Sequence, residues 1–391
     1  MKRLTVVDSL RGFSLMGILF ANLLLFQFGH YGANYPEFYG VDAVNKLLIY
    51  WVKIFIEGSF MPIFAVLFGF GLMKMSESLE KKGRPVKRAI IRRGLILFIM
   101  GLLHSAYLFS GDILYLYGTI TFIVVWMLKF KVRSLMIVAA LVIPLIVGIF
   151  LVNPDFMIAA EQSFATGGLT AEQSEYLAAE KSVFSTGTLQ ERNDFFMEED
   201  PFMAFTDEEF LLLVPIAILF NIPLFLIGMI LAKNRFFETG LTSVKKNFIY
   251  LTPIFILFKA CMVIWPDNDI LGTLGIFSMY LLSFSYISLF YALYQRWQAL
   301  KLFEAIGRLS LTNYIAQSVF HSFIYYGYGM QRFGDDNFLL SLLIATLFFI
   351  LQVALSNFYF KYFKQGPLEY IARVVTYWSF SPNKKTDNKL V

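Results

Sequence analysis

Runs of about twenty consecutive apolar residues recur along this 391-residue chain, and they constrain its fold more than any other feature. A helix of about 20 residues spans the roughly 30 Å hydrocarbon core of a bilayer. Hydrophobic residues make up 58% of the chain and charged residues only 16%, with a mean hydropathy of +0.63. No soluble domain needs that much apolar surface. We therefore expect an all-α, polytopic integral membrane protein that forms a single transmembrane domain over residues 1–391.

We expect about ten transmembrane helices, with both chain termini in the cytoplasm. Loops that hold most of the Lys and Arg residues alternate with loops that hold almost none. Because positively charged short loops stay in the cytoplasm, this alternation orients the chain. The expected spans cover residues 8–28, 59–73, 90–108, 112–128, 134–152, 210–231, 247–265, 270–293, 308–328 and 338–360.

Two segments outside these spans need a separate interpretation. Residues 41–57 have a helical but amphipathic pattern, so they either lie in the membrane interface or lengthen the second span. Residues 153–209 form an acidic extracytoplasmic loop between the fifth and sixth spans. This loop is too long for a simple connection, and it is either a solvated, partly helical hairpin or a lid over the outer mouth.

The composition argues against several kinds of partner. The net charge of +5 comes from loops whose basic residues topology explains, so we expect no nucleic acid partner. We expect no metal, because the chain has no His-x-x-x-His pair, no cysteine pair and no intramembrane carboxylate cluster.

The first apolar run is too long for a signal peptide, and we interpret it as a retained span.

Polar residues follow one face of the first span, from Val6 to His30. At about 100° per residue, Asp8, Arg11 and Asn22 fall within one stripe of a helix. Hydrocarbon does not tolerate such groups without partners, so this face is expected to look into protein or a wet cavity. The simpler alternative is an intrahelical Asp8–Arg11 pair near the cytoplasmic interface, with Asn22 bonded to a neighbouring helix.

The three histidines of the chain are expected near the outer ends of spans 1, 3 and 9. His104 is followed eight residues later by Asp112, and a tight turn would bring the two together. His321 shares a helical face with Asn313 and Gln317. Each histidine alone is better explained by a bond to backbone or lipid headgroups, whereas the set, with Asn22, Asp112 and Asn313 around it, favours a functional site.

Lys259 lies in the middle of the seventh expected span. A lysine at that depth snorkels to the interface or pairs with an acidic group. Asp8, Glu57 and Asp112 are its three candidate partners, and the sequence does not choose among them.

Motifs distributed along the whole chain resemble those of the YeiB-type bacterial membrane proteins, a family long described only as a domain of unknown function. The motifs are VDSLRGFSLMGILFAN, FMPIFAVLFGFGL, RRGLILFIMGLLHSAYLFSGDILYLYG, GRLSLTNYIAQS and QGPLEYIARVVTY. The resemblance implies a multi-pass protein of the bacterial plasma membrane, surrounded by membrane lipids.

The first motif also resembles, more distantly, the transmembrane acyltransferases typified by heparan-alpha-glucosaminide N-acetyltransferase. Asp8, Arg11, Asn22 and His30 match the D-x-x-R-G opening, the asparagine and the histidine of that family. A Phe-x-Pro-x-Phe segment begins at Phe60 here, as it does in the next span of that family. The segment between Asn22 and His30 is shorter here and lacks the glycine run of that family, so His104 with Asp112 is the alternative for the catalytic role.

This resemblance implies an acyltransferase that uses acetyl-CoA or another acyl-CoA from the cytoplasm as donor. A histidine near the outer face would activate a small-molecule, glycan or lipid acceptor. The resemblance implies that Asn22 or Asn313 would hold the thioester oxygen. Four arginines are candidates for contacts with the phosphates of the donor, namely Arg11, Arg92, Arg93 and Arg308.

A transporter or exporter of a small molecule is the alternative function, with Asp8, Lys259 and Asp112 coupling the transport to protons. The absence of a clear internal repeat weighs against it. Neither the acceptor nor the oligomeric state follows from the sequence, and a homodimer is left open.

Overall fold

The computed structural model describes residues 4–152, 168–195, 201–202, 207–266 and 268–380. Every regular element among these residues is a helix, as expected for the all-α class. The helices of the first half are α1 (Thr5–Gly32), η1 (Pro36–Tyr39), α2 (Ala43–Phe55), α3 (Met61–Glu80), α4 (Val86–Tyr107), α5 (Leu114–Val124), η2 (Val125–Met127) and α6 (Val132–Val152). The later helices are α8 (Ala171–Thr186), α9 (Leu189–Phe195), α10 (Asp207–Lys233), α11 (Ser243–Ile264), α12 (Asp269–Tyr294), η3 (Gln298–Leu302), α13 (Phe303–Arg308), α14 (Ser310–Tyr325), α15 (Phe338–Tyr362) and α16 (Pro367–Tyr377).

Within the described residues, seven helices are long and apolar enough to cross a membrane. They are α1, α3, α4, α10, α11, α12 and α15, and each coincides with an expected span. Two of the other three expected spans correspond to shorter apolar helices, namely α5 with η2, and α6, and the third corresponds to α14. The chain is therefore a multi-pass helical membrane protein, while the count of ten spans stays a prediction.

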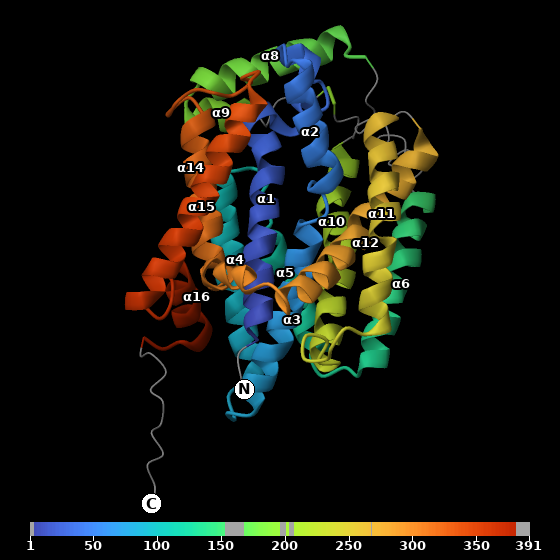
Figure 1. Cartoon of the computed structure of the whole chain (residues 1–391), viewed down its shortest axis with the longest axis vertical. Helices are drawn as coiled ribbons and strands as arrows, with labels where there is room; N and C mark the ends of the chain where they lie inside the picture. Colours follow the sequence, from blue (N-terminus) through green and yellow to red (C-terminus); the bar gives the residue numbers. More distant parts are fainter. Residues whose placement is uncertain (1–3, 153–167, 196–200, 203–206, 267, 381–391) are drawn as a thin grey trace, which may run out of the picture.

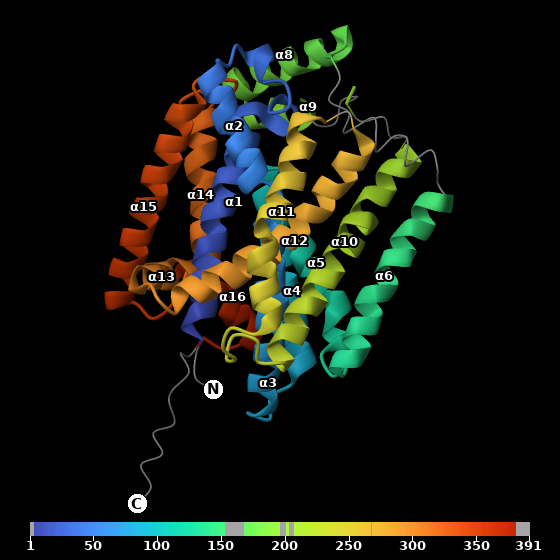
Figure 2. The same cartoon turned by 45° about the vertical axis from the view of Figure 1, so that its right-hand side comes forward.

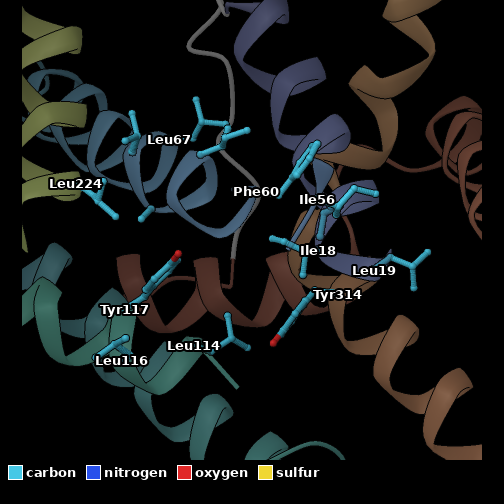
Figure 3. Close-up of a cluster of buried hydrophobic side chains, with 14 of the residues drawn as sticks. Ile18, Leu19, Ile56, Phe60, Leu67, Leu114, Leu116, Tyr117, Leu224 and Tyr314 are labelled. Atoms are coloured by element: carbon cyan, nitrogen blue, oxygen red, sulfur yellow. The ribbon is translucent and has the colours of Figure 1, made fainter. Parts of the chain in front are cut away.

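α1 is the central helix of the bundle (Figures 1 and 2). Both views place α14 and α15 on one side of it and α6, α10, α11 and α12 on the other. Of the residues in the most apolar part of α1, 67% are buried, against 11% of those in α11. α1 is therefore surrounded by protein, whereas most of α11 lies on the surface of the bundle. Figure 3 shows part of the buried apolar cluster around α1, to which α3, α5, α10 and α14 also contribute side chains.

The two ends of the bundle differ in composition. The α3–α4 loop, the start of α1 and α16 lie at the lower end in Figure 1, and the α3–α4 loop is rich in Lys and Arg. α8 and α9 lie across the upper end. The acidic segment 153–209 therefore contains helices at the end opposite the basic loops, although residues 153–167 and part of its second half lie outside the described residues. The acidic and basic segments thus lie at opposite ends of the bundle, and the assignment of the basic end to the cytoplasm stays a prediction.

α2 and α3 follow one another along the bundle and are interrupted between Phe55 and Met61 (Figure 1). Gly58 takes φ +68° at this break, a conformation that L-residues with side chains rarely adopt. Of the two interpretations of residues 41–57, the structure is closer to the one in which they extend the second span, but as a discontinuous helix. The ninth expected span, residues 308–328, corresponds to α14, and the short helix α13 ends where that span was expected to begin.

Candidate functional site

His104 and Asp112 meet at the turn between α4 and α5, as their spacing predicts. The His104 carbonyl accepts hydrogen bonds from the N–H groups of Leu108 and Phe109, which end α4. Asp112 Oδ2 accepts from Leu114 N at 2.9 Å and Tyr115 N at 3.3 Å, so the carboxylate occupies the positive end of α5. His104 Nδ1 lies 2.8 Å from Asp112 Oδ1.

The hydrogen bonds around Asp112 determine which nitrogen of His104 carries the proton. Tyr314 Oη donates to Asp112 Oδ1 at 3.1 Å, so Asp112 accepts from Tyr314, from two backbone N–H groups and from the imidazole. Because Asp112 acts as a hydrogen-bond acceptor here, a neutral His104 that donates to it is the tautomer protonated at Nδ1. This leaves a lone pair on His104 Nε2, which is buried and has no hydrogen-bond partner among the described residues.

The dyad depends on an unusually close approach of α4 to α5. Gly101 lies one turn before His104, and a Cβ atom at Gly101 would lie 2.1 Å from Tyr115 N and 2.8 Å from Asp112 Oδ2. Only a glycine allows the backbone of α5 to come this near. Gly101 thus brings the start of α5, and with it Asp112, within reach of the imidazole.

Aromatic side chains connect the dyad to α1 and α14. The His104 ring centroid lies 5.1 Å from that of Tyr314 and 6.3 Å from that of Phe109. Phe109 stacks on Phe26 of α1 at 4.5 Å, and Phe26 lies 5.5 Å from His321 of α14. Phe109 and Phe26 therefore connect two of the three histidines.

The predicted polar stripe of α14 faces the protein interior. Asn313, Gln317 and His321 are at most 7% exposed. Asn313 Nδ2 donates to Ser356 Oγ of α15 at 3.1 Å, and Gln317 Nε2 donates to Gln352 Oε1 at 3.0 Å. The side-chain amide of Asn313 thus links α14 to α15. Of the two asparagines that are candidates for binding the thioester oxygen, Asn22 is therefore the one whose amide has no such structural role.

Arg11 and Arg93 come together at the end of the bundle that is opposite α8. Arg11 Nη1 donates to Asp8 Oδ1 at 3.1 Å, so the expected pair is present. The charge of Arg11 repels that of Arg93, and Glu369 of α16 attracts it. Two positive charges that interact with each other favour the binding of an anion near them.

The other two candidate arginines lie against aromatic rings of different helices. The Arg92 guanidinium lies 5.2 Å from the centroid of the Trp378 ring, and that of Arg308 lies 3.8 Å from the centroid of the Phe360 ring. Neither contact brings these arginines to the Arg11–Arg93 pair.

Three further candidates lie apart from the dyad or are only partly enclosed. His30 is exposed at the outer end of α1, beside the Tyr31 ring. Asn22 is half-buried, and its side-chain amide makes no hydrogen bond to the residues that the structure describes. Lys259 is fully buried and donates to the Glu57 carbonyl and, at 3.0 Å, to Ser59 Oγ, so of its three expected partners it contacts Glu57, through the backbone.

Sequence reasoning missed Tyr314 and Phe26. Tyr314 follows Asn313 and stands three and seven residues before Gln317 and His321, which is the spacing of one helical face. Phe26 lies eighteen residues after Asp8, or five helical turns, and so continues the polar stripe of α1. Both signals were present, but aromatic residues in apolar helices are too common to single out.

Comparisons with known proteins find relatives that match nearly the whole chain. Residues 231–379 match a family described as a protein of unknown function, DUF418. The chain is 28% identical to the uncharacterized protein YxaH of Bacillus subtilis strain 168, over 98% of this chain and 96% of YxaH. It is 24% identical to the uncharacterized protein YeiB of Escherichia coli strain K12, over 98% of both chains. The chain is thus similar to YeiB-type proteins along nearly its whole length, in agreement with its motifs. No solved structure matches it significantly.

Proposed function

We propose that this protein is a transmembrane acyltransferase with His104 as its general base. The observation that carries the proposal is the buried dyad, in which Asp112 fixes the tautomer of His104 and leaves Nε2 free to accept a proton. The same pairing of a carboxylate with an imidazole orients and strengthens catalytic bases in many hydrolases and transferases.

The reaction would proceed by direct transfer. His104 Nε2 takes the proton of an acceptor hydroxyl or amine, and the acceptor oxygen or nitrogen attacks the thioester carbonyl of an acyl-CoA. As the carbon–sulfur bond breaks, the thiolate of CoA takes the proton from His104. The amide of Asn22 is the candidate donor to the carbonyl oxygen as negative charge develops on it.

The geometry supports a donor that enters from the end of the bundle where Arg11 and Arg93 lie. Arg93 is eleven residues before His104 on α4, which corresponds to the same face and a rise of about 16 Å. Arg11 and Phe26 mark a similar path along α1, of about 22 Å. A long, extended donor with its phosphates at the arginines would place its acyl group near the dyad.

The test is acyl transfer by protein purified in lipid nanodiscs, measured as CoA thiol released from acetyl-CoA in the presence of a panel of amines and alcohols. His104→Gln and Asp112→Asn should each lower the rate by about 10²–10⁴-fold while leaving the protein folded. Leu103→Ala is the matched control, because Leu103 precedes His104 on α4 and is 55% exposed. His30→Gln should stay active, and its inactivity would move the base to His30. Full activity of His104→Gln would end the proposal.

Transport is a second candidate function, favoured by the break between α2 and α3. Discontinuous helices whose ends face a buried charge are common in transporters. Here the ammonium of Lys259 faces the carbonyl end of α2, and Ser283 of α12 donates to the Ser59 carbonyl at 2.6 Å. A disulfide between Ser59→Cys and Ser283→Cys, in a Cys261→Ser background, would stop a protein that works by moving this break. A transferase with a fixed dyad would keep its activity in the locked form.

A further inference from the structure

Four buried atoms near Phe26 and Tyr314 have no hydrogen-bond partner among the residues that the structure describes. One is the hydroxyl of Tyr325, whose ring centroid lies 6.5 Å from that of Phe26 and 6.3 Å from that of His321. The other three belong to imidazole or amide groups. They are His104 Nε2, Gln317 Oε1 and His321 Nε2. Their residues are 3%, 3% and 1% exposed. A buried polar atom without a partner costs free energy, so native proteins retain one where a ligand or water completes it.

All three atoms are hydrogen-bond acceptors, and the surrounding bonds fix this character. The tautomer of His104 follows from Asp112, as derived above. His321 Nδ1 lies 2.8 Å from the Gln317 carbonyl, which only accepts, so Nδ1 carries the proton and Nε2 the lone pair.

The orientation of the Gln317 amide follows from its neighbour in the same way. Gln352 Nε2 donates to the Asn313 carbonyl at 3.0 Å, so Gln352 Oε1 is the atom that accepts from Gln317 Nε2. This leaves Gln317 Oε1 as the open atom. If the oxygen and nitrogen atoms of either amide were exchanged, two acceptors or two donors would face each other.

The three acceptors belong to one contiguous group of side chains. Gln317 lies one turn from both Tyr314 and His321 on α14, and Tyr314 contacts the His104 ring. Phe26 and Phe109 complete the connection from His321 back to His104. The group therefore offers several lone pairs and no open donor from these three side chains.

We propose that the acyl acceptor presents at least two hydrogen-bond donors here, as a polyhydroxy or amino headgroup does. This inference rests on the proposed function, in which His104 takes the proton of the reacting hydroxyl or amine. Gln317 and His321 would then bind the neighbouring donors and align the reacting group. Carboxylate and phosphodiester headgroups offer only lone pairs, and they would leave all three atoms unpaired and be rejected.

Binding in the absence of any acyl donor tests this inference separately from catalysis. The protein is placed in nanodiscs of phosphatidylcholine, whose headgroup has no hydrogen-bond donor, and its unfolding temperature is measured with added probes. Octyl β-D-glucoside and octylamine carry hydroxyl and ammonium donors. The fully O-methylated octyl glucoside keeps the oxygen atoms but has no donor, and octanoate is ionised. We expect stabilisation by the glucoside, the amine or both, and none by the methylated glucoside or octanoate.

Variants then locate the binding site. His321→Phe keeps an aromatic ring and Gln317→Leu keeps a side chain of similar length, and each should weaken probe binding about fivefold or more for one lost hydrogen bond. Val319→Ala is the control, because Val319 is on the same helix and 50% exposed. Equal stabilisation by the methylated glucoside would overturn the inference, and so would probe binding that survives in both variants. If probes bind as expected but no thiol is released, the acyltransferase proposal fails. The inference that this site binds groups with several hydrogen-bond donors then still stands.

Discussion

Gly101→Ala tests whether the dyad depends on the contact between α4 and α5. The added methyl group would lie 2.1 Å from Tyr115 N, where real contacts of a Cβ atom are about 3.4 Å or more. The obstacle is backbone, so the two helices must separate by about 1 Å. His104 and Asp112 sit on the two sides of this contact, and the separation should lengthen their 2.8 Å hydrogen bond.

Two opposing effects set the expected change in stability. Overpacking of a close helix contact costs about 1–3 kcal/mol, and replacing glycine by alanine inside a helix returns up to about 1 kcal/mol. The free energy of unfolding should thus fall by about 0–2 kcal/mol, a loss that leaves the protein folded. A shift of about 1 Å between catalytic groups costs about 100-fold in rate, so activity should fall much further than stability.

The assay pairs thermal unfolding with acyl transfer, and Gly272→Ala of α12 serves as the matched control. A Cβ atom at Gly272 meets nothing within 4 Å, so this substitution should keep or slightly raise stability and leave the rate unchanged. If Gly101→Ala behaves like Gly272→Ala in both measurements, the dyad does not depend on this contact and the reasoning is wrong.

Three other predictions follow from the same structure. Asp8→Ala should reduce the yield of folded protein, because it removes the carboxylate partner of Arg11 in a low-dielectric setting. Combining it with Arg11→Leu should restore the yield. Normal activity of the double variant would show that Arg11 does not belong to the proposed acyl-CoA site. Lys259→Met should lower the unfolding temperature, because the Glu57 carbonyl loses its donor, whereas Lys259→Arg should lower it less; equal losses would argue against the hydrogen bond as the cause. Epitope tags read in intact cells should be internal at Gly83 and external at Gly168, and an external Gly83 tag would reverse the assigned sidedness.

Much of the bundle could be predicted from apolar run length alone. α1, α4 and α15 begin and end within a few residues of the expected spans, because about 20 residues are needed to cross a bilayer whatever the side chains do. The divided helices were harder to predict. The α2–α3 break is stabilised by contacts from α11 and α12, more than 200 residues away along the chain, and no local pattern reports those contacts.

The candidate site was predictable where partners are close in the chain. His104 and Asp112 are joined by one turn, and Asp8 and Arg11 by one turn of helix, so both pairs could be expected from spacing. The contact between Tyr314 and Asp112 joins helices 202 residues apart and could not. The hydrogen-bond partner of Lys259 could not be predicted for another reason. It is a main-chain carbonyl, and because every residue has one, the sequence does not single it out.

The buried polar groups of this protein fall into two kinds, and the difference bears on function. Lys245 donates to the Phe236, Thr239 and Gly240 carbonyls, and Lys259 donates to Glu57 and Ser59, so each ammonium is surrounded by acceptors in the protein itself. Groups satisfied in this way stabilise loops and helix breaks, which accounts for their burial without any proton transfer. This satisfaction weakens the case for Lys259 as a proton carrier in transport.

His104 and His321 are of the second kind. In each, one nitrogen is fixed by a group of the protein while the other is buried and open among the described residues. Folding alone gives no reason to orient two imidazoles and leave their second nitrogens unpaired, because an apolar ring of the same shape would pack without that cost. An arrangement that costs stability and holds a lone pair in a defined direction is what a base and a binding group require. The site between α1, α4, α5 and α14 is therefore where the chemistry of this protein is to be sought.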